Sequence, residues 1–164
     1  MSVRFLEIFP ARGILSLCLL LMGLLEMGGA AAVERFRGQR LFLPVYSEVP
    51  YGNRNAVLDL AVTMTLRNLD EEQSITLKRV DYIGVKGGIV RSFLSDGVPL
   101  KPMAAEIYVI RESDRTAGRS AGFLVEWESS APAIPPIVEG VMVNGAYNQG
   151  MAFVTTARVL SEKP

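Results

Sequence analysis

The chain contains no histidine, and its one cysteine, Cys18, lies close to the N-terminus. Histidine is the commonest general base near neutral pH and the commonest metal ligand in proteins. Its absence excludes a Ser-His-Asp triad, a Cys-His pair and a histidine metal site. We therefore expect no catalytic residue of these classes, no metal site and no cofactor.

The chain also lacks an excess of charge, because 17 basic and 17 acidic residues are scattered along it. A balanced chain has no electrostatic attraction to nucleic acid or to an anionic membrane surface. No glycine-rich phosphate loop opens a helix after a strand. Nucleic acid is therefore not an expected partner.

What the chain does have is an N-terminal segment with the three parts of an export signal. Arg4 and Arg12 give a positive start, an apolar run extends from Ile14 to Leu25, and small residues occupy positions 28–32. The apolar run is shorter than the about 20 residues of a membrane-spanning helix. We predict a signal peptide over residues 1–32, helical in its apolar part and cleaved after Ala32, with Ala30 as the second choice.

The alternative to cleavage is that this segment stays on the protein and tethers it to a membrane. We expect no other contact with a membrane. Cys18 is not expected to carry a lipid, because lipid attachment needs a small residue before the cysteine and Leu17 stands there. Cleavage leaves residues 33–164, which contain no cysteine and form no disulfide. That length suits a single domain.

Period-two alternation marks the clearest strand, Ala56–Asn68, whose predicted inner face carries Ala56, Leu58, Leu60, Val62, Met64 and Leu66. Ser74–Ile83 and Ile89–Leu94 are predicted to form a hairpin around the glycines at 87 and 88. The apolar phase changes near Lys78, which predicts a bulge or a strand passing between sheets.

Further strands are predicted at Glu106–Arg111, Ala121–Glu128, Ile137–Val143 and Met151–Leu160. Prolines cannot donate to a ladder, so Val98–Pro102 and Ser129–Pro136 are predicted connections. This succession, with no helix after the signal, predicts an all-β fold: an immunoglobulin-like antiparallel β-sandwich of about 7–9 strands forming one domain over residues 33–164. A closed barrel is the alternative.

Carboxylates are the remaining catalytic groups. Glu126 and Glu139 would form an acid and base pair for glycoside hydrolysis if they faced each other in a cleft, about 5–10 Å apart. Glu126 alternates with Trp127 and is expected to point to solvent. Glu139 shares a strand face with Ile137 and Val141, which we expect to point inward or against another surface, unless the carboxylate reaches water at the strand start.

Five residues are candidates for contact with a partner: Tyr46, Tyr51, Glu112, Asp114 and Glu139. Four of them lie in two polar segments, 46–55 and 112–119. The second segment lacks the regular acidic spacing of a calcium loop. Asp114 is also explained as a turn residue that bonds its own backbone.

An ordered series of segments resembles a small exported bacterial family known as domain of unknown function 3124: Leu43–Ser47 (LPVYS), Leu60–Asp70 (LAVTMTLRNLD), Val80–Tyr82 (VDY), Pro102–Ala104 (PMA), Glu112–Asp114 (ESD), Phe123–Trp127 (FLVEW) and Pro135–Val143 (PPIVEGVMV). The resemblance extends from about Leu41 to Val159. It implies a periplasmic or lipid-anchored protein without an established activity, and it assigns no site residues.

From these observations we expect an exported, non-enzymatic binding or structural module of the bacterial cell envelope, located in the periplasm or outside the cell. Its expected partner is an envelope protein, a peptide or a glycan, because a strand edge or loops of an all-β domain can present such a surface. Two alternatives stay open. One is a carboxylate-dependent hydrolase of cell-wall or surface glycan, and the other is a membrane-tethered envelope protein with an uncleaved signal.

Overall fold

A computed structural model describes residues 33–52, 56–145 and 150–164. The predicted signal peptide and its cleavage sites lie outside the described residues. Residue contacts separate Glu34–Pro164, as one compact unit, from Met1–Val33. The described part of Glu34–Pro164 contains strands and turns and no helix, so the all-β prediction is confirmed.

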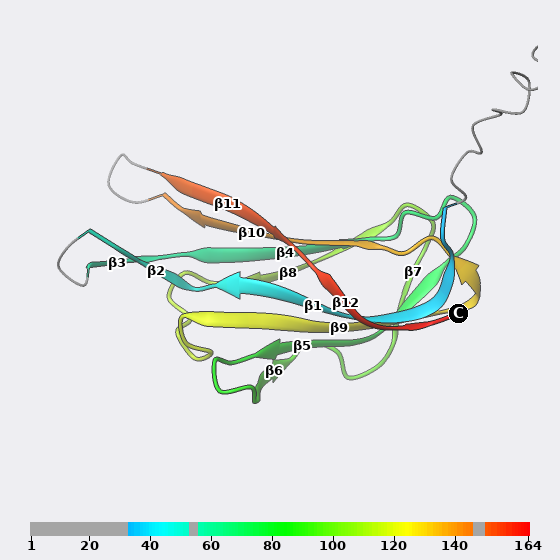
Figure 1. Cartoon of the computed structure of the whole chain (residues 1–164), viewed down its shortest axis with the longest axis horizontal. Coiled ribbons are helices and arrows are strands. Elements are labelled where there is room, and N and C mark those ends of the chain that lie inside the picture. Colours follow the sequence, from blue (N-terminus) through cyan, green and yellow to red (C-terminus); the bar gives the residue numbers. More distant parts are fainter. Residues whose placement is uncertain (1–32, 53–55, 146–149) are drawn as a thin grey trace, which may run out of the picture. The chain divides into compact units, whose positions relative to one another are not determined.

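The strands form three antiparallel sheets (Figure 1). The six-stranded sheet has the order β12-β1-β9-β5-β6, with β7 also beside β5: β1 (Phe36–Tyr46), β5 (Ile75–Ile83), β6 (Ile89–Ser92), β7 (Val98–Leu100), β9 (Ser120–Ala133) and β12 (Arg158–Lys163). The four-stranded sheet has the order β11-β10-β4-β8: β4 (Ala61–Arg67), β8 (Ala105–Ile110), β10 (Ile137–Asn144) and β11 (Met151–Thr156). A two-stranded ribbon pairs β2 (Glu48–Tyr51) with β3 (Ala56–Asp59).

Strands that were predicted as continuous are divided where the chain passes from one sheet to another. The predicted strand Ala56–Asn68 breaks at Leu60, whose N–H donates to the Ser47 carbonyl at 2.8 Å. The predicted strand Met151–Leu160 breaks at Ala157, and its two halves join different sheets. Figure 1 shows this crossing from β11 to β12. These two breaks add two strands to those predicted, and β1, β2 and β7 lie where the sequence predicts no strand.

The predicted bulge is present, because the register of β5 against β9 shifts between Leu77 and Arg79. Two predicted connections are wrong in part. Pro99 lies in the short strand β7, which pairs with β5 at a sheet margin where its missing N–H costs nothing. Strand β9 continues to Ala133, so the connection to β10 is only residues 134–136.

The core combines the inward faces of the two larger sheets. Val62, Met64 and Leu66 are fully buried, which confirms the predicted alternation in β4. Gly140 marks a close approach, because a Cβ there would lie 3.2 Å from side-chain atoms of Leu43 and Val45 in the other sheet. The largest fully buried side chains are Trp127, Tyr82, Phe123, Leu43, Leu60, Met64, Leu66, Ile75, Leu77, Ile110, Met142 and Val45.

The inward orientation that we considered for Glu139 is wrong. In β10 the buried positions are Val138, Gly140 and Met142, whereas Glu139 and Val141 lie on the outward face. Both faces of this strand are apolar, so alternation alone does not say which one joins the core. The contact of Gly140 with the six-stranded sheet decides the orientation.

Asp70 is the acceptor of a buried polar cluster in the turn between β4 and β5. Its carboxylate accepts the backbone N–H groups of Glu72, Gln73 and Ile134, each at 2.9 Å, and pairs with Arg35 at 2.8 Å. Burial would raise the pKa of Asp70, but these N–H donors and the Arg35 charge outweigh it and lower the pKa from 3.8 to about 2. The cluster joins the turn to the β9–β10 connection and to the start of β1.

Tyr82 carries a buried hydroxyl that has no hydrogen-bond partner among the described residues. The side chain is fully buried against Phe123, with ring centroids 5.3 Å apart. Burial, with a smaller contribution from the Asp114 charge, raises its pKa to about 12. An unsatisfied buried hydroxyl costs about 1–3 kcal/mol.

Tyr82→Phe is therefore expected to raise the free energy of unfolding by about 1 kcal/mol, because it removes the unpartnered hydroxyl and keeps the ring. Urea denaturation of the two proteins measures the difference. The matched control is Tyr108→Phe. Tyr108 is half-buried, and its hydroxyl is not among the buried polar groups that lack a hydrogen-bond partner. Equal destabilisation by both variants would contradict the prediction.

Candidate functional site

The loop between β8 and β9, residues 111–119, is fixed to neighbouring strands by ion pairs. Arg115 pairs with Asp59 at the end of β3, at 2.5 Å, and Arg119 pairs with Glu48 in β2. The Ser47 hydroxyl also donates to the Gly118 carbonyl at 2.8 Å. The structure thus brings together the two segments that the sequence singled out, 46–55 and 112–119, within their described residues.

Asp114 holds this loop in shape. Its carboxylate accepts the hydroxyl of Thr116 at 2.5 Å and the backbone N–H of Thr116 at 3.1 Å, and it pairs with Arg91 at 2.7 Å. The hydroxyl contact, followed by the backbone and Arg91 contacts, lowers the pKa of Asp114 against the effect of burial. Asp114 is therefore a turn residue whose carboxylate stabilises the loop through Thr116.

An apolar cleft of about 520 Å³ lies beside the ion pair between Glu48 and Arg119. The rings of Tyr46 and Phe153 lie across from each other there, with centroids 6.0 Å apart and planes tilted by 51°. The residues that line this apolar cleft are Tyr46, Glu48, Val49, Pro50, Arg119, Ser120 and Phe153. Aromatic rings and a proline offer an apolar surface, and the ion pair marks its polar border.

The cleft forms where the margin of the four-stranded sheet meets the open edge of β1. Strand β12 covers the edge of β1 only as far as Phe42, so the following residues of β1 pair with β9 alone. Strand β11 approaches that open edge, and the Thr155 hydroxyl donates to the Pro44 carbonyl at 2.7 Å. Tyr46 ends β1 and Phe153 lies within β11, so both rings come from strand margins rather than from flexible tips.

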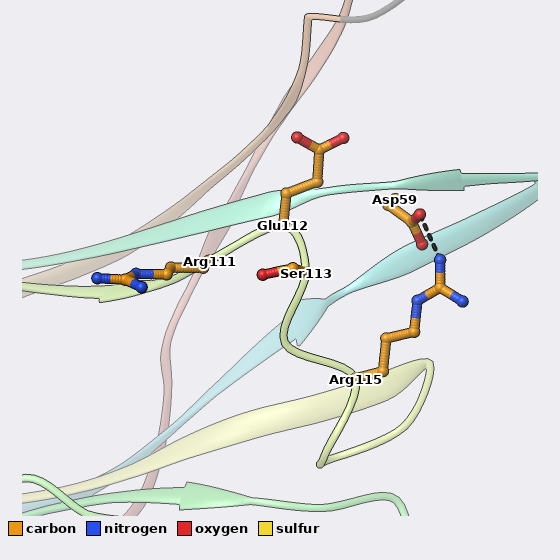
Figure 2. Close-up of a pocket in the computed structure, with 5 residues that line it drawn as sticks. All are labelled: Asp59, Arg111, Glu112, Ser113 and Arg115. Carbon is orange, nitrogen blue, oxygen red and sulfur yellow. Dashed lines mark hydrogen bonds and ion pairs between the residues drawn. The ribbon is translucent and has the colours of Figure 1, made fainter.

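A second depression, of about 620 Å³, is charged (Figure 2). Its lining residues are Asp59, Arg111, Glu112, Ser113 and Arg115. Figure 2 shows that Arg111 and Glu112 point away from the Asp59–Arg115 pair instead of converging on one point. Glu112 accepts a hydrogen bond from the Asn144 amide at 3.2 Å. This charged depression therefore lacks the convergent groups of a catalytic or ligand site.

Metal ligands do not gather in the described part of the chain: no three Asp, Glu, His or Cys side chains there lie close enough to hold an ion. Asp59 does have one buried oxygen, Oδ1, without a partner. Its other oxygen already accepts Arg115, and that cation would compete with a bound metal.

The five candidate residues divide between separate surfaces. Tyr46 lines the apolar cleft, whereas Tyr51 is 48% exposed on β2 and lies outside the cleft lining. Glu112 lines the charged depression, and Asp114 holds the adjacent loop. Glu139 lies apart from all four, on the outward face of the four-stranded sheet.

Glu126 and Glu139 come from different sheets, and each lies on the side turned away from the shared core. Glu126 pairs with Arg40 at 3.3 Å and with Arg79 at 3.4 Å. The structure therefore does not bring these two carboxylates together as an acid and base pair.

Sequence reasoning missed Phe153, Glu48 and Arg119 as cleft residues. Phe153 lies in a strand whose buried and exposed residues alternate in the usual way. Its local sequence does not indicate that β11 approaches β1. Glu48 and Arg119 lie within the two polar segments, but their pairing depends on the fold.

The fold defines an all-β domain with antiparallel sheets, and comparison with known proteins gives its family. Residues 38–160 match the family described as "Protein of unknown function (DUF3124)", so the chain belongs to that family. This confirms the resemblance seen in the sequence.

A search of curated proteins found no match. Among solved structures, the crystal structure of Thermotoga maritima 1070 is similar, with a TM-score of 0.41 and 13% identity over 73% of this chain and 92% of that chain. In the described residues, no helix is long and apolar enough to cross a membrane.

Proposed function

We propose that this protein is an exported, non-enzymatic binding module of the bacterial cell envelope. In this proposal its two larger sheets form an immunoglobulin-like sandwich, and the signal peptide is removed after Ala32. The predicted export signal, the absence of histidine and the lack of cysteine after residue 32 support it. The family match assigns no activity to the protein, since the family is described as one of unknown function.

The observation that carries the proposal is the apolar cleft. Its aromatic pair, Tyr46 and Phe153, is held at two strand margins, and the ion pair between Glu48 and Arg119 borders it. Exposed aromatic groups in a preformed concave surface are typical of binding sites, where apolar burial supplies the affinity and border charges supply orientation. We propose that the partner is an envelope protein, peptide or glycan that packs an apolar group against these two rings.

Tyr46→Ala is expected to reduce capture of an envelope partner at least 10-fold, because it removes one wall of the apolar cleft. The protein is purified as the cell exports it, its N-terminus is sequenced, and it is immobilised against a detergent-solubilised envelope fraction. Quantitative mass spectrometry then compares the captured components between variants.

The matched control is Tyr51→Ala, which removes an exposed tyrosine that does not line the cleft. Capture by this variant should stay within about twofold of the original. Equal loss in both variants, or no component that depends on Tyr46, would refute the cleft as the binding site. An N-terminus at Val33 supports cleavage, whereas an intact N-terminus would favour the membrane-tethered alternative.

The hydrolase alternative gains no support from a specific observation. It depends on Glu126 and Glu139, which lie in different sheets, and Glu126 is already paired with two arginines. We therefore make no catalytic proposal.

A further inference from the structure

The outward face of the four-stranded sheet is almost free of charge. Its large aliphatic side chains are well exposed, with Ile107 at 59% and Val154 at 58%. The outward positions on the four strands are Ala61, Thr63, Thr65, Arg67, Ala105, Ile107, Val109, Ile137, Glu139, Val141, Val143, Ala152, Val154 and Thr156. We call this set the aliphatic face.

Register places these side chains in continuous rows across the sheet. Val154, Val141, Thr63 and Val109 form one row, since each is opposite the next on the neighbouring strand. Thr156, Glu139, Thr65 and Ile107 form the adjacent row. Apart from Glu139, both rows consist of β-branched side chains, and they extend over every strand of the sheet.

The outward face of the six-stranded sheet is different. It carries Arg40, Arg79 and Glu126 in one ion-paired group, and Glu128 paired with Lys163 nearby. In a sheet with one solvent-exposed face, apolar and polar residues normally alternate along each strand. Strands that are apolar on both sides are typical of sheets covered on both faces. Apart from Glu106, Glu139 and the terminal Asn144, strands β8 and β10 have this second pattern. The aliphatic face is therefore built to be covered.

We propose that the aliphatic face binds the same face of a second copy of this chain. The argument for this occupant is charge complementarity. Glu139 and Arg67 are the charged residues among the outward positions of the four described strands, and they have opposite sign. Glu139 is opposite Thr65 and Arg67 is opposite Ile137, so the two charges occupy adjacent rows on adjacent strands.

A two-fold axis that lies in the interface and passes between these residues exchanges their positions. Glu139 of each copy then faces Arg67 of the other, and two equivalent ion pairs form within an otherwise apolar contact. Such an isologous interface is self-complementary and closes as a dimer. A carboxylate covered by an apolar surface without a cation would oppose association, so this pairing is what permits the face to be buried.

The dimensions of the face indicate a reversible dimer. Four strands spaced about 4.8 Å apart and about six residues long present roughly 400 Å² per copy in projection. Interfaces of this size are at the low end for specific contacts. Dissociation constants in the micromolar range are therefore expected, and the measurement has to extend to high protein concentration.

Sedimentation equilibrium of the protein as exported, from about 5 to about 500 μM, tests this inference. The original protein should shift from monomer to dimer across this range. Val141→Asp should weaken dimerisation at least 10-fold, because it buries a new charge in the centre of the contact. The control Val90→Asp changes a valine of similar exposure, 40% against 36%, on β6 of the other sheet, and should leave dimerisation unchanged.

Charge exchange distinguishes a specific interface from general damage to the fold. Glu139→Arg alone and Arg67→Glu alone should each weaken the dimer at least 10-fold, and the double variant should restore it. A protein that stays monomeric at the highest concentration overturns the proposal, as does a dimer that tolerates Val141→Asp or a double variant without restoration. The inference is independent of the apolar cleft, so its failure leaves the proposed binding function standing.

Discussion

Asp70→Ala is expected to lower the free energy of unfolding by about 3 kcal/mol, because it removes the acceptor of a buried polar cluster. Three backbone N–H groups, those of Glu72, Gln73 and Ile134, lose their carboxylate. Arg35 loses its ion-pair partner. The Ile134 contact joins the β9–β10 connection to the β4–β5 turn, so its loss also releases these two segments from each other.

Urea denaturation followed by circular dichroism measures this loss. The control is Asp96→Ala, which removes an exposed carboxylate that accepts a hydrogen bond from the neighbouring Ser95 hydroxyl. It should change stability by less than about 0.5 kcal/mol. Equal effects of the two variants would show that the Asp70 cluster does not hold these segments together.

The same carboxylate predicts a pH dependence. The pKa of Asp70 is lowered from 3.8 to about 2 in the folded state, so the unfolded chain binds the proton more readily. Its contribution, about 2 kcal/mol from that difference, is complete above the unfolded pKa and is lost as pH falls through the folded pKa. The stability gap between the original protein and Asp70→Asn should therefore shrink between pH 5 and pH 2, and a constant gap would contradict the assignment.

Gly140→Val is expected to lower the free energy of unfolding by about 2–3 kcal/mol through overpacking between the sheets. The first added carbon would already lie 3.0 Å from Thr155 Oγ1 and 3.2 Å from side-chain atoms of Leu43 and Val45. The two further methyl groups of valine have no free volume, because Leu43 and Val45 are fully buried. The sheets must then separate locally or the side chains must leave their preferred rotamers.

Thermal unfolding measures this cost, and Val143→Ile is the matched control. That change adds one methylene to the same strand on the exposed side, where Val143 is 41% exposed. It should leave the melting temperature within a few degrees of the original. A stable Gly140→Val protein would mean that the two sheets do not pack closely at this point.

The local sequence pattern was sufficient to identify the core-facing residues where one face of a strand is apolar and the other is not. In β4 the alternation identified Val62, Met64 and Leu66 as core residues, and all three are fully buried. A phase change in the next strand identified the bulge near Arg79. These predictions succeed because side chains alternate across a strand whatever its partner is.

The local sequence pattern did not identify the core-facing side of a strand where both faces are apolar. Strand β10 offers Val138 and Met142 on one side and Ile137 and Val141 on the other, so period two does not choose between them. The choice depends on the small volume of Gly140 opposite Leu43, a contact between residues far apart in the sequence. The position of Glu139 follows from that contact.

The sequence by itself determined the all-β class, the family and the absence of histidine chemistry, because alternation, motif order and composition are local properties. The tertiary structure alone decided which sheet each half-strand joins, because ladder partners are chosen by long-range pairing. It also placed Tyr46 beside Phe153 and assembled the aliphatic face, since each of these surfaces is formed by strands distant in the chain.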